Sequence, residues 1–485
     1  MNKKILFFAA MIMTETALIA SATYYSKSFL ALPSPYQVGT PEAHNAFDLL
    51  RWNNDECHFS FEAAAIGTAS THANELACYF SPNNKSQMLV AGDSAAQSSY
   101  RDINAWQLGI EQSRFASTVE WCPRYTSSGL GLQGRLKLFG IHGKKVWLGA
   151  LTSVQHVTTN MRMRETSINQ TITTNTTETP TNVCAAFNQT AWNYGKICGR
   201  QTKTGFADIT LQLGCELLKS EDVHLNGYLA AVIPTGNKPC ACYLFEPILG
   251  NGHHWGGLLG LFGDFCLIGE PPHGLYFLIS SNGCYYFQNK QTRSFDLIGK
   301  PWSRYMNVYV DQTAAHSNTI APGINSFTQC VTIKPHYAIN NLFSFTAIID
   351  NFSFEFGYYL HARQQEEACL ASTWPTNIAL VGTSENGTTS KARTIACNYL
   401  GTPSTPTADS DIANNTYARI TTNDLDLNSA AIPGFIENSI FGAAAYEFSG
   451  NKHLNYLTIG GSYHFGATNC FVKRWDIWAK LGITI

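Results

Sequence analysis

The sequence contains little charge. Only 14% of its 485 residues are Asp, Glu, Lys or Arg, whereas soluble domains carry roughly a quarter. The formal net charge is -2, so the chain has neither the basic excess that nucleic-acid binding requires nor an acidic tail, and we predict no nucleic-acid partner. Aromatic residues, in contrast, make up 12% of the chain. This combination suits a lipid-facing surface or a carbohydrate-binding β-sandwich.

Long apolar runs are missing after the N-terminus. The most apolar later stretch, GLLGLFGDFCLI at 257–268, is short and contains Asp264, so helical membrane spans of about twenty residues are not predicted. The N-terminus itself carries Lys3 and Lys4, then ILFFAAMIM, then Ala-Ser-Ala. This order is typical of an export signal, and we assign residues 1–22 to one, with an uncleaved anchor as the alternative.

The chain does contain stretches in which apolar and polar residues alternate with a period of two. From Ala207 to Leu217 the odd positions are apolar, while the even positions include Asp208 and Glu216. After the charged stretch 219–222 the alternation restarts, again with apolar residues at odd positions. Such a pattern predicts a β-hairpin with two unlike faces. Its strands reach the roughly nine to eleven residues that a tilted strand needs to cross a bilayer.

The connections between such strands alternate in length. Short turns near 142, 219, 270, 350 and 450 alternate with long polar intervals at about 158–205, 234–256, 288–341 and 363–433. The chain also ends in an alternating strand, RWDIWAKLGITI. Outer-membrane barrels have short periplasmic turns and long extracellular loops, and an open sheet edge is not tolerated in lipid. We therefore predict an all-β fold, a closed antiparallel transmembrane β-barrel of 12–14 strands located in the outer membrane.

The predicted domain boundaries follow from the first recognisable barrel strand. We assign residues 113–485 to the barrel, with RFASTVEW at 114–121 as a strand and two further candidates within 303–334. Residues 23–112 then form an N-terminal segment, either a plug inside the lumen or a periplasmic appendage.

If the apolar parity faces lipid, the other parity lines the lumen. Positive and negative residues are balanced there, which leaves two interpretations open: a wall held together by salt bridges, or a wetted pathway for solutes. The residues predicted to line the lumen are Arg135, Lys137, Asp208, Glu216, His224, Asp264, Glu355, His361, Arg363, Arg474, Asp476 and Lys480.

No motif predicts a cofactor or a metal site. Cys240 and Cys242 lie near His253 and His254, but they do not complete a ligand pattern, and we interpret them as loop residues. Among the fourteen cysteines of an exported chain, Cys184 and Cys198 form the best disulfide candidate.

One hairpin resembles a known family. GFADITLQLG, followed by a strand ending in AAVIPTGNKP, resembles a hairpin of bacterial outer-membrane transporters for long-chain fatty acids and aromatic hydrocarbons. The resemblance implies a 14-stranded barrel, an N-terminal plug and passive uptake of apolar small molecules. The chain ends in Ile485 instead of the terminal Phe common in such barrels. The stretches PWSRY, PGIN and ARQQE resemble uncharacterised outer-membrane proteins of amoeba-associated Dependentiae bacteria.

Together these features predict a passive outer-membrane channel for small solutes, with membrane lipid, lipopolysaccharide and the solutes as partners. They do not predict the oligomeric state. A host-contacting surface is an alternative, because INQTITTNTTETPT at 168–181 is rich in hydroxyl groups. A barrel hydrolase is a third hypothesis, based only on His316, Ser317 and Asn318; a nucleophile needs a base and an orienting group that this tripeptide does not supply, so we predict that the protein is not an enzyme.

Overall fold

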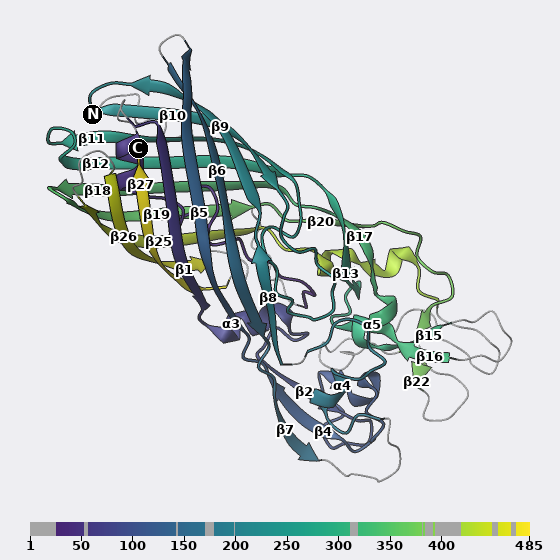
Figure 1. Cartoon of the computed structure of the whole chain (residues 1–485). Coiled ribbons are helices and arrows are strands. Elements are labelled where there is room, and N and C mark those ends of the chain that lie inside the picture. The colour runs from purple at the N-terminus through teal and green to yellow at the C-terminus, as the bar shows by residue number, and fades with distance from the viewer. Residues whose placement is uncertain are drawn as a thin grey trace.

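The computed structural model describes residues 26–52, 57–141, 144–169, 179–197, 199–310, 319–380, 382–383, 391–392, 419–448, 454–466 and 472–485. Its main feature is a barrel of twelve strands in which every neighbouring pair is antiparallel (Figure 1). The predicted export signal, Cys198 and the His316 tripeptide lie outside the described residues. No helix among the described residues is long and apolar enough to cross a membrane.

The barrel strands are long and mostly follow one another around the wall. β1 pairs with both β5 and β27, which closes the barrel. The short β8 (Arg200–Phe206) continues the line of β9 along β6. In chain order the twelve are β1 (Phe59–Ser70), β5 (Arg124–Ile141), β6 (Lys144–Asn160), β9 (Ile209–Lys219), β10 (Val223–Ile233), β11 (Gly256–Ile268), β12 (Gly274–Tyr286), β18 (His336–Ile349), β19 (Phe352–Arg363), β25 (Phe435–Phe448), β26 (Leu454–Gly466) and β27 (Arg474–Thr484).

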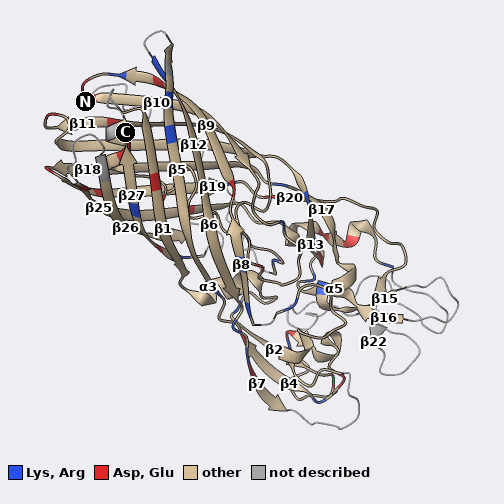
Figure 2. Cartoon of the chain, viewed as in Figure 1, with Lys and Arg blue, Asp and Glu red and all other residues tan. Residues whose placement is uncertain are grey.

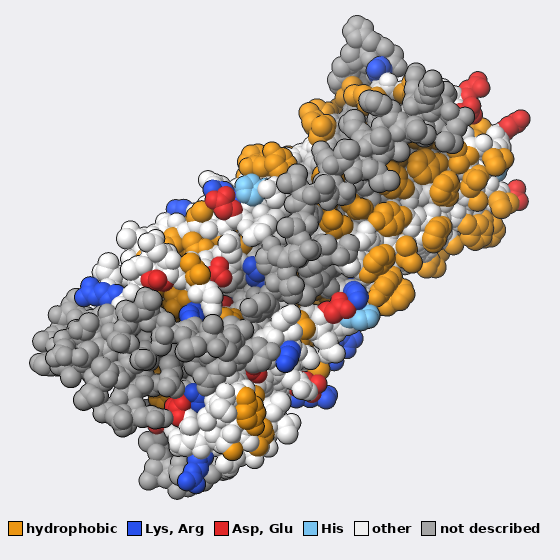
Figure 3. All heavy atoms as spheres, turned by 180° about the vertical axis from the view of Figure 1, so that it is seen from behind, with side chains coloured by type: hydrophobic (Ala, Val, Ile, Leu, Met, Phe, Trp, Pro, Cys, Tyr) orange, Lys and Arg blue, Asp and Glu red, His pale blue; other side chains and the backbone are white. Residues whose placement is uncertain are grey.

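The alternating parity places apolar side chains on the outside of the wall. Leu229, Leu259, Phe356 and Ile477 are each more than 60% exposed, which only a lipid environment makes favourable for so many large apolar groups. Figure 3 shows hydrophobic side chains gathered over the barrel half of the face that it draws, whereas fewer appear among the described residues of the other half. The predicted transmembrane β-barrel is confirmed.

The inner surface of the wall packs aromatic rings over glycines of the neighbouring strand. Trp147 lies directly opposite Gly214, and Tyr456 lies directly opposite Gly482. A Cβ atom at Gly482 would lie 2.0 Å from the Tyr456 ring, and one at Gly214 would lie 2.2 Å from the Trp147 ring. The rings therefore cover backbone that no side chain protects, a known means of fixing strand register.

The first strand of the barrel is β1 and not the strand predicted at 114–121. β1 lies within residues 23–112, which we had assigned to the N-terminal segment, so the barrel begins at residue 59 and not at 113. The outward side chains of β1 are mostly Ala and Gly after Phe61, and this weak hydrophobic contrast hid the strand. The predicted strand 114–121 contains β4 (Ala116–Glu120), which pairs with β2 and β7 outside the barrel. The strand number lies within the predicted 12–14, but the fourteen strands implied by the family resemblance are wrong.

The two rims of the barrel differ as the turn spacing predicted. The turns at 220–222, 269–273 and 350–351 lie on the same rim as the C-terminus, which we call the short-turn rim. The turns at 142–143 and 449–453 and the loop near 400 lie outside the described residues. The loops near 180 and 245 lie at the opposite end (Figure 1). By the rule for outer-membrane barrels, the short-turn rim faces the periplasm.

The long loops fold into a domain at that opposite end, which we call the cap. Its core contains Trp121, Phe187, Trp302 and Tyr305, all buried. The short strands predicted within 303–334 belong to the cap and not to the barrel. The cap comprises α3 (Ala73–Phe80), β2 (Gln87–Ala91), β3 (Ile103–Asn104), η2 (Ala105–Leu108), β4, β7 (Arg164–Asn169), α4 (Val183–Ala186), β13 (Asn289–Ser294), β14 (Asp296–Leu297), η3 (Ser303–Tyr305), β15 (Asn307–Val310), β16 (Thr319–Pro322), α5 (Gly323–Ser326), β17 (Thr328–Lys334), β20 (Glu367–Leu370), β21 (Ala379–Leu380), β22 (Gly382–Thr383), β23 (Lys391–Ala392), η4 (Thr422–Asp424), β24 (Leu425–Asp426) and η5 (Leu427–Ala430).

Candidate functional site in the barrel lumen

Residues 26–52 run from the cap core into the barrel, and from here on the name N-terminal segment refers to these residues alone. At the cap end, the Ser26 hydroxyl donates to Asp296 and the Lys27 ammonium donates to the Asn428 carbonyl oxygen, at 2.8 and 2.5 Å. Deeper in the barrel, Gln155 of β6 donates to the Ser34 hydroxyl at 2.6 Å. The segment thus begins in the cap and continues past inward-facing side chains of the wall.

A short helix ends the N-terminal segment near the short-turn rim. α2 (Ala46–Trp52) is capped by Asn45, whose side-chain oxygen accepts from the Phe47 and Asp48 backbone amides, the usual arrangement at a helix start. The Asn45 amide nitrogen donates to Glu62 of β1 at 2.7 Å. One side chain therefore both starts the helix and attaches it to the wall.

Two of the predicted lumen residues contact this helix. The Arg135 guanidinium lies 2.8 Å from the Asp48 carboxylate, and both side chains are at most 10% exposed. The Lys137 ammonium donates to the Trp52 carbonyl oxygen at 2.6 Å and lies over the Trp52 ring. These contacts are partly buried and charge-assisted, so they are stronger than fully exposed pairs.

Two more predicted lumen residues contact His44 of the N-terminal segment. The His44 imidazole lies 2.8 Å from the Glu355 carboxylate, which also accepts from the Ser344 hydroxyl at 2.6 Å. The Lys480 ammonium donates to the His44 carbonyl oxygen. Charges from β19 and β27 therefore both hold this part of the segment.

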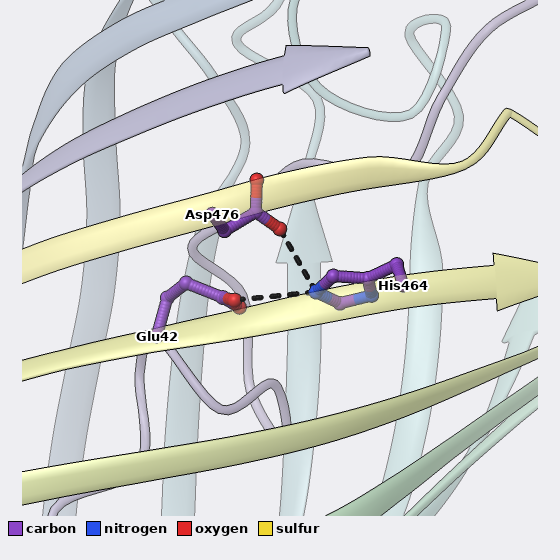
Figure 4. Close-up of side chains that lie close together, drawn as sticks. All are labelled: Glu42, His464 and Asp476. Atoms are coloured by element: carbon purple, nitrogen blue, oxygen red, sulfur yellow. Dashed lines mark ion pairs between the residues drawn. The ribbon is translucent and has the colours of Figure 1, made fainter. Parts of the chain in front are cut away.

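A buried charge network joins the N-terminal segment to β25, β26 and β27, and Figure 4 shows three of its members, Glu42, His464 and Asp476. His464 lies 2.9 Å from Asp476 through Nε2 and 2.5 Å from Glu437 through Nδ1, and Glu42 of the segment lies 3.5 Å from Nε2. The Arg474 guanidinium lies 2.7 Å from Glu437 and 3.2 Å from Asp476. Both ring nitrogens of His464 face carboxylates, and Nδ1 also lies 3.3 Å from the Arg474 guanidinium, so the ring is enclosed by charged groups.

The spacing within this network also resembles a metal site. The ligand atoms of Glu42, His464 and Asp476 lie within 4.8 Å of one another. Arg474, however, already supplies positive charge to the same carboxylate of Asp476, and it would repel a bound cation. We therefore interpret the network as an electrostatic attachment of the N-terminal segment to the wall.

Four further predicted lumen residues have partners on the wall or in the cap. The His224 imidazole lies 3.0 Å from the Asp264 carboxylate across β10 and β11. Near the cap, the Arg363 guanidinium lies 2.6 Å from Glu366, and His361 lies 2.7 Å from the Asn340 side-chain oxygen.

Two predicted residues lie at opposite ends of β9. Asp208, between β8 and β9, accepts from the Asn251 backbone amide at 2.8 Å. Glu216 is half-exposed near the turn to β10. Neither contacts the N-terminal segment through a bond between described residues.

Several important residues were missed by the sequence reasoning. Glu42, His44, Asn45 and Asp48 lie in residues 23–112, where no strand or helix was predicted, and Glu62 lies on the overlooked β1. The only available signal was that Glu62 shares the parity of Ser60 and Ala64 in an otherwise apolar alternation.

Small cavities lined by described residues lie beside the N-terminal segment, and three of them adjoin one another. They measure about 40, 20 and 30 Å³, and a water molecule needs roughly 10–15 Å³. The first and second cavities share Val38 and Leu151, and the second and third share Ser34, Gln37 and Tyr286. The cavities therefore lie one after another along the segment, separated by the side chains that they share, and we call this row of cavities the file.

The lining of this file combines aromatic and amide side chains with a few charged or titratable ones. The first cavity is lined by Gln133, Gln212, Tyr228 and Phe262, together with His44 and Arg135, which are paired with Glu355 and Asp48. The second includes Tyr36, Thr210, Asn340 and Asp208, and the third includes Asn251, Tyr286, His361 and Arg363, which is paired with Glu366.

The candidate cysteine and histidine cluster of the cap has other partners. The Cys240 thiol lies 2.9 Å from Glu246. His254 is held by the Phe287 carbonyl oxygen and by Gln291, at 2.9 and 2.8 Å. Both groups therefore serve the packing of the loop.

Comparison with known proteins finds similarity only among solved structures. No protein-family model and no curated protein matches the chain. The COG4313 outer membrane channel of Pseudomonas putida F1 is 9% identical, with 88% of this chain and 96% of that chain covered and a TM-score of 0.41. A Pseudomonas aeruginosa FadL homologue is 8% identical, with coverage of 96% and 98% and a TM-score of 0.30. The β domain of the Bordetella autotransporter BrkA is 9% identical, with coverage of 88% and 100% and a TM-score of 0.28.

The closed wall and its apolar exterior decide the class of protein. This is an outer-membrane β-barrel. The similarities above, with TM-scores below 0.5, add no argument about a solute, and the resemblance to Dependentiae proteins stays a prediction.

Proposed function

We propose that the protein is a passive outer-membrane channel for small neutral solutes, and that its N-terminal segment acts as a plug. The observation that supports this proposal best is the file of small cavities between the N-terminal segment and the barrel wall from β5 to β19. A barrel that served only as an anchor would have no need for such a file.

The arrangement of charge favours neutral solutes. Most of the luminal charges are paired with one another or with the N-terminal segment, as in Asp48–Arg135 and Glu355–His44, whereas Asp208 beside the second cavity accepts a backbone hydrogen bond from Asn251. Pores that select one sign of ion carry rings of one charge. The amides and aromatic rings of the file suit instead small uncharged molecules with an apolar part.

The size of the file requires the plug to move. A cavity of about 40 Å³ holds about three water molecules at roughly 10–15 Å³ each, so a larger solute needs the segment to shift. The segment is held by hydrogen bonds in the cap, through Lys27, and beside the short-turn rim, through Trp52. We infer that it shifts in place and does not leave the lumen.

The test is conductance and solute flux of the full chain and of a plug variant. Residues 34–48 are replaced by a Gly/Ser linker of equal length, which removes the luminal side chains but leaves β1 intact. The control replaces the cap residues 93–100 in the same way. Deletion of residues 23–112 is unsuitable because it would remove β1.

We expect low conductance from the full chain and from the control, and a large increase from the plug variant, with a reversal potential near zero in a salt gradient. Liposome swelling should show slow entry of small uncharged solutes into vesicles that contain the full chain. A plug variant as closed as the full chain would show that the segment is not the barrier. No solute entry through either protein would refute the channel.

A further inference from the structure

In one sector of the outer wall, rows of polar side chains lie between the last apolar row and the cap. The register places Leu130, Val154 and Phe206 side by side on β5, β6 and β8. Phe206 and Leu130 are 55% and 46% exposed, so this row marks the cap-side edge of the lipid-facing surface in this sector. On the cap side of this row, every outward position of the three strands is polar.

The polar rows consist of hydroxyl groups and an imidazole, followed by arginines. His156 and Thr158 of β6 lie opposite Thr204 and Thr202 of β8. The His156 imidazole lies 2.6 Å from the Thr204 hydroxyl. These groups point outward together, because strand residues two apart share a face.

Arginines occupy the next row. Arg124 of β5 and Arg200 of β8 both lie opposite Asn160 of β6. Arg200 donates to the Thr158 hydroxyl at 3.4 Å. Both arginines are exposed, and no described residue forms an ion pair with either. Since neighbouring strands lie about 4.8 Å apart, the two arginines stand about 10 Å apart across β6.

Other strands carry aromatic residues toward their cap-side ends. Tyr285 of β12 packs against Tyr337 of β18 and against Phe287, which follows β12, and Tyr463 of β26 packs against Trp475 of β27. Such aromatic girdles are usual at the interfaces of outer-membrane barrels. The sector of β5, β6 and β8 is therefore chemically distinct from these aromatic sectors. Figure 2 shows that most positions of the barrel strands are uncharged, with isolated charged residues among them.

We call the outward polar side chains of β5, β6 and β8 on the cap side of Phe206 the polar panel. We propose that the polar panel binds the phosphorylated sugar headgroup of a glycolipid in the outer leaflet, with the acyl chains against the row that contains Phe206. Arginine forms two parallel hydrogen bonds to phosphate, and hydroxyl groups and imidazole suit sugar hydroxyls. The continuity of the panel with lipid-facing side chains favours a lipid over a soluble phosphate. Two arginines about 10 Å apart can each hold one phosphate of a diphosphorylated headgroup.

The test is lipid binding to the full chain in detergent, measured by native mass spectrometry. The probes are lipid A with two phosphates, lipid A with one phosphate, and fully dephosphorylated lipid A. The variant is R124Q/R200Q, and R124K/R200K keeps the charge while losing the paired hydrogen bonds. The matched control is Arg114→Gln, an exposed arginine of the cap. Heat-modifiable migration on a gel reports that each barrel is folded.

We expect R124Q/R200Q to bind diphosphorylated lipid A at least about tenfold more weakly, the factor for loss of one charge-assisted contact. R124K/R200K should be intermediate and the control unchanged. Removal of the lipid phosphates should weaken binding to the native chain by a similar factor. Equal binding of native chain and double variant, or equal binding of phosphorylated and dephosphorylated lipid, would overturn the proposal. Displacement of the lipid by millimolar inorganic phosphate would show a phosphate site and not a lipid site.

Discussion

The attachment of the N-terminal segment to the wall can be measured at a single ion pair. Asp48 and Arg135 lie 2.8 Å apart, with side chains that are 5% and 10% exposed. We expect Asp48→Asn and Arg135→Gln each to lower the free energy of unfolding by about 3–5 kcal/mol, because each leaves the opposite charge buried without its partner. The double variant removes both charges, so its loss should be smaller than the sum of the two single losses by about 1–3 kcal/mol.

The assay is urea unfolding of the refolded protein in detergent micelles, followed by tryptophan fluorescence. Lys334 and Glu367 of the cap provide the control pair: they lie 2.9 Å apart, but their side chains are 36% and 49% exposed. Solvent screens such a pair, so its double-variant cycle should show no measurable coupling. If the Asp48–Arg135 cycle is additive, or shows no more coupling than the control, the segment is not held to the wall by this pair.

Three further predictions concern the wall and the cap. Gly482→Val should cost about 1–3 kcal/mol of stability, because the new side chain would meet the Tyr456 ring; Gly283→Ala, which meets no atom within 4 Å, should cost less, and equal losses in urea unfolding would contradict the packing. Leu229→Arg should cost about 2–4 kcal/mol in lipid vesicles but Leu229→Ala much less, because this position faces lipid; tolerance of Arg would reverse the facing. Burial lowers the pKa of His254 in the cap from 6.5 to about 4, so the folded cap binds fewer protons than the unfolded chain between these values. Stability should therefore fall by about 3 kcal/mol as the pH drops from 6.5 to 4, and a His254→Gln variant that keeps this dependence would refute the cause.

The family resemblance and the structure agree in part. The hairpin GFADITLQLG with AAVIPTGNKP forms β9 and β10 of the barrel wall. The implied strand number is wrong. The implied plug is a proposal that the contacts of His44 and Asp48 with the wall support.

The facing of the wall residues was readable from sequence because it is a local property. Leu211 and Gln212 are adjacent in the chain, yet one is exposed and the other buried, as strand geometry requires for any extended pair. Short turns and long loops are local in the same sense. The sequence therefore predicted the barrel class, the two rims and the outward position of residues such as Phe354.

Where the sequence reasoning went wrong, a local pattern had two possible causes. The alternation in 114–121 reflects burial of Val119 in the cap core and not contact with lipid. β1 in turn gave little hydrophobic contrast, because Ala63, Ala65 and Gly67 are small. Its place in the wall follows from pairing with β27, which comes more than four hundred residues later in the chain.

The sequence by itself determined which parity of each strand is apolar, and so it determined that the chain forms a membrane-spanning barrel. Only the tertiary structure decided which strand closes that barrel and what fills it. Closure depends on hydrogen bonds between β1 and β27, and the attachment of Glu42 beside His464 and Asp476 joins groups from distant parts of the chain. Such contacts leave no periodicity in the sequence, because each depends on the position of a partner that the chain brings near only when it folds.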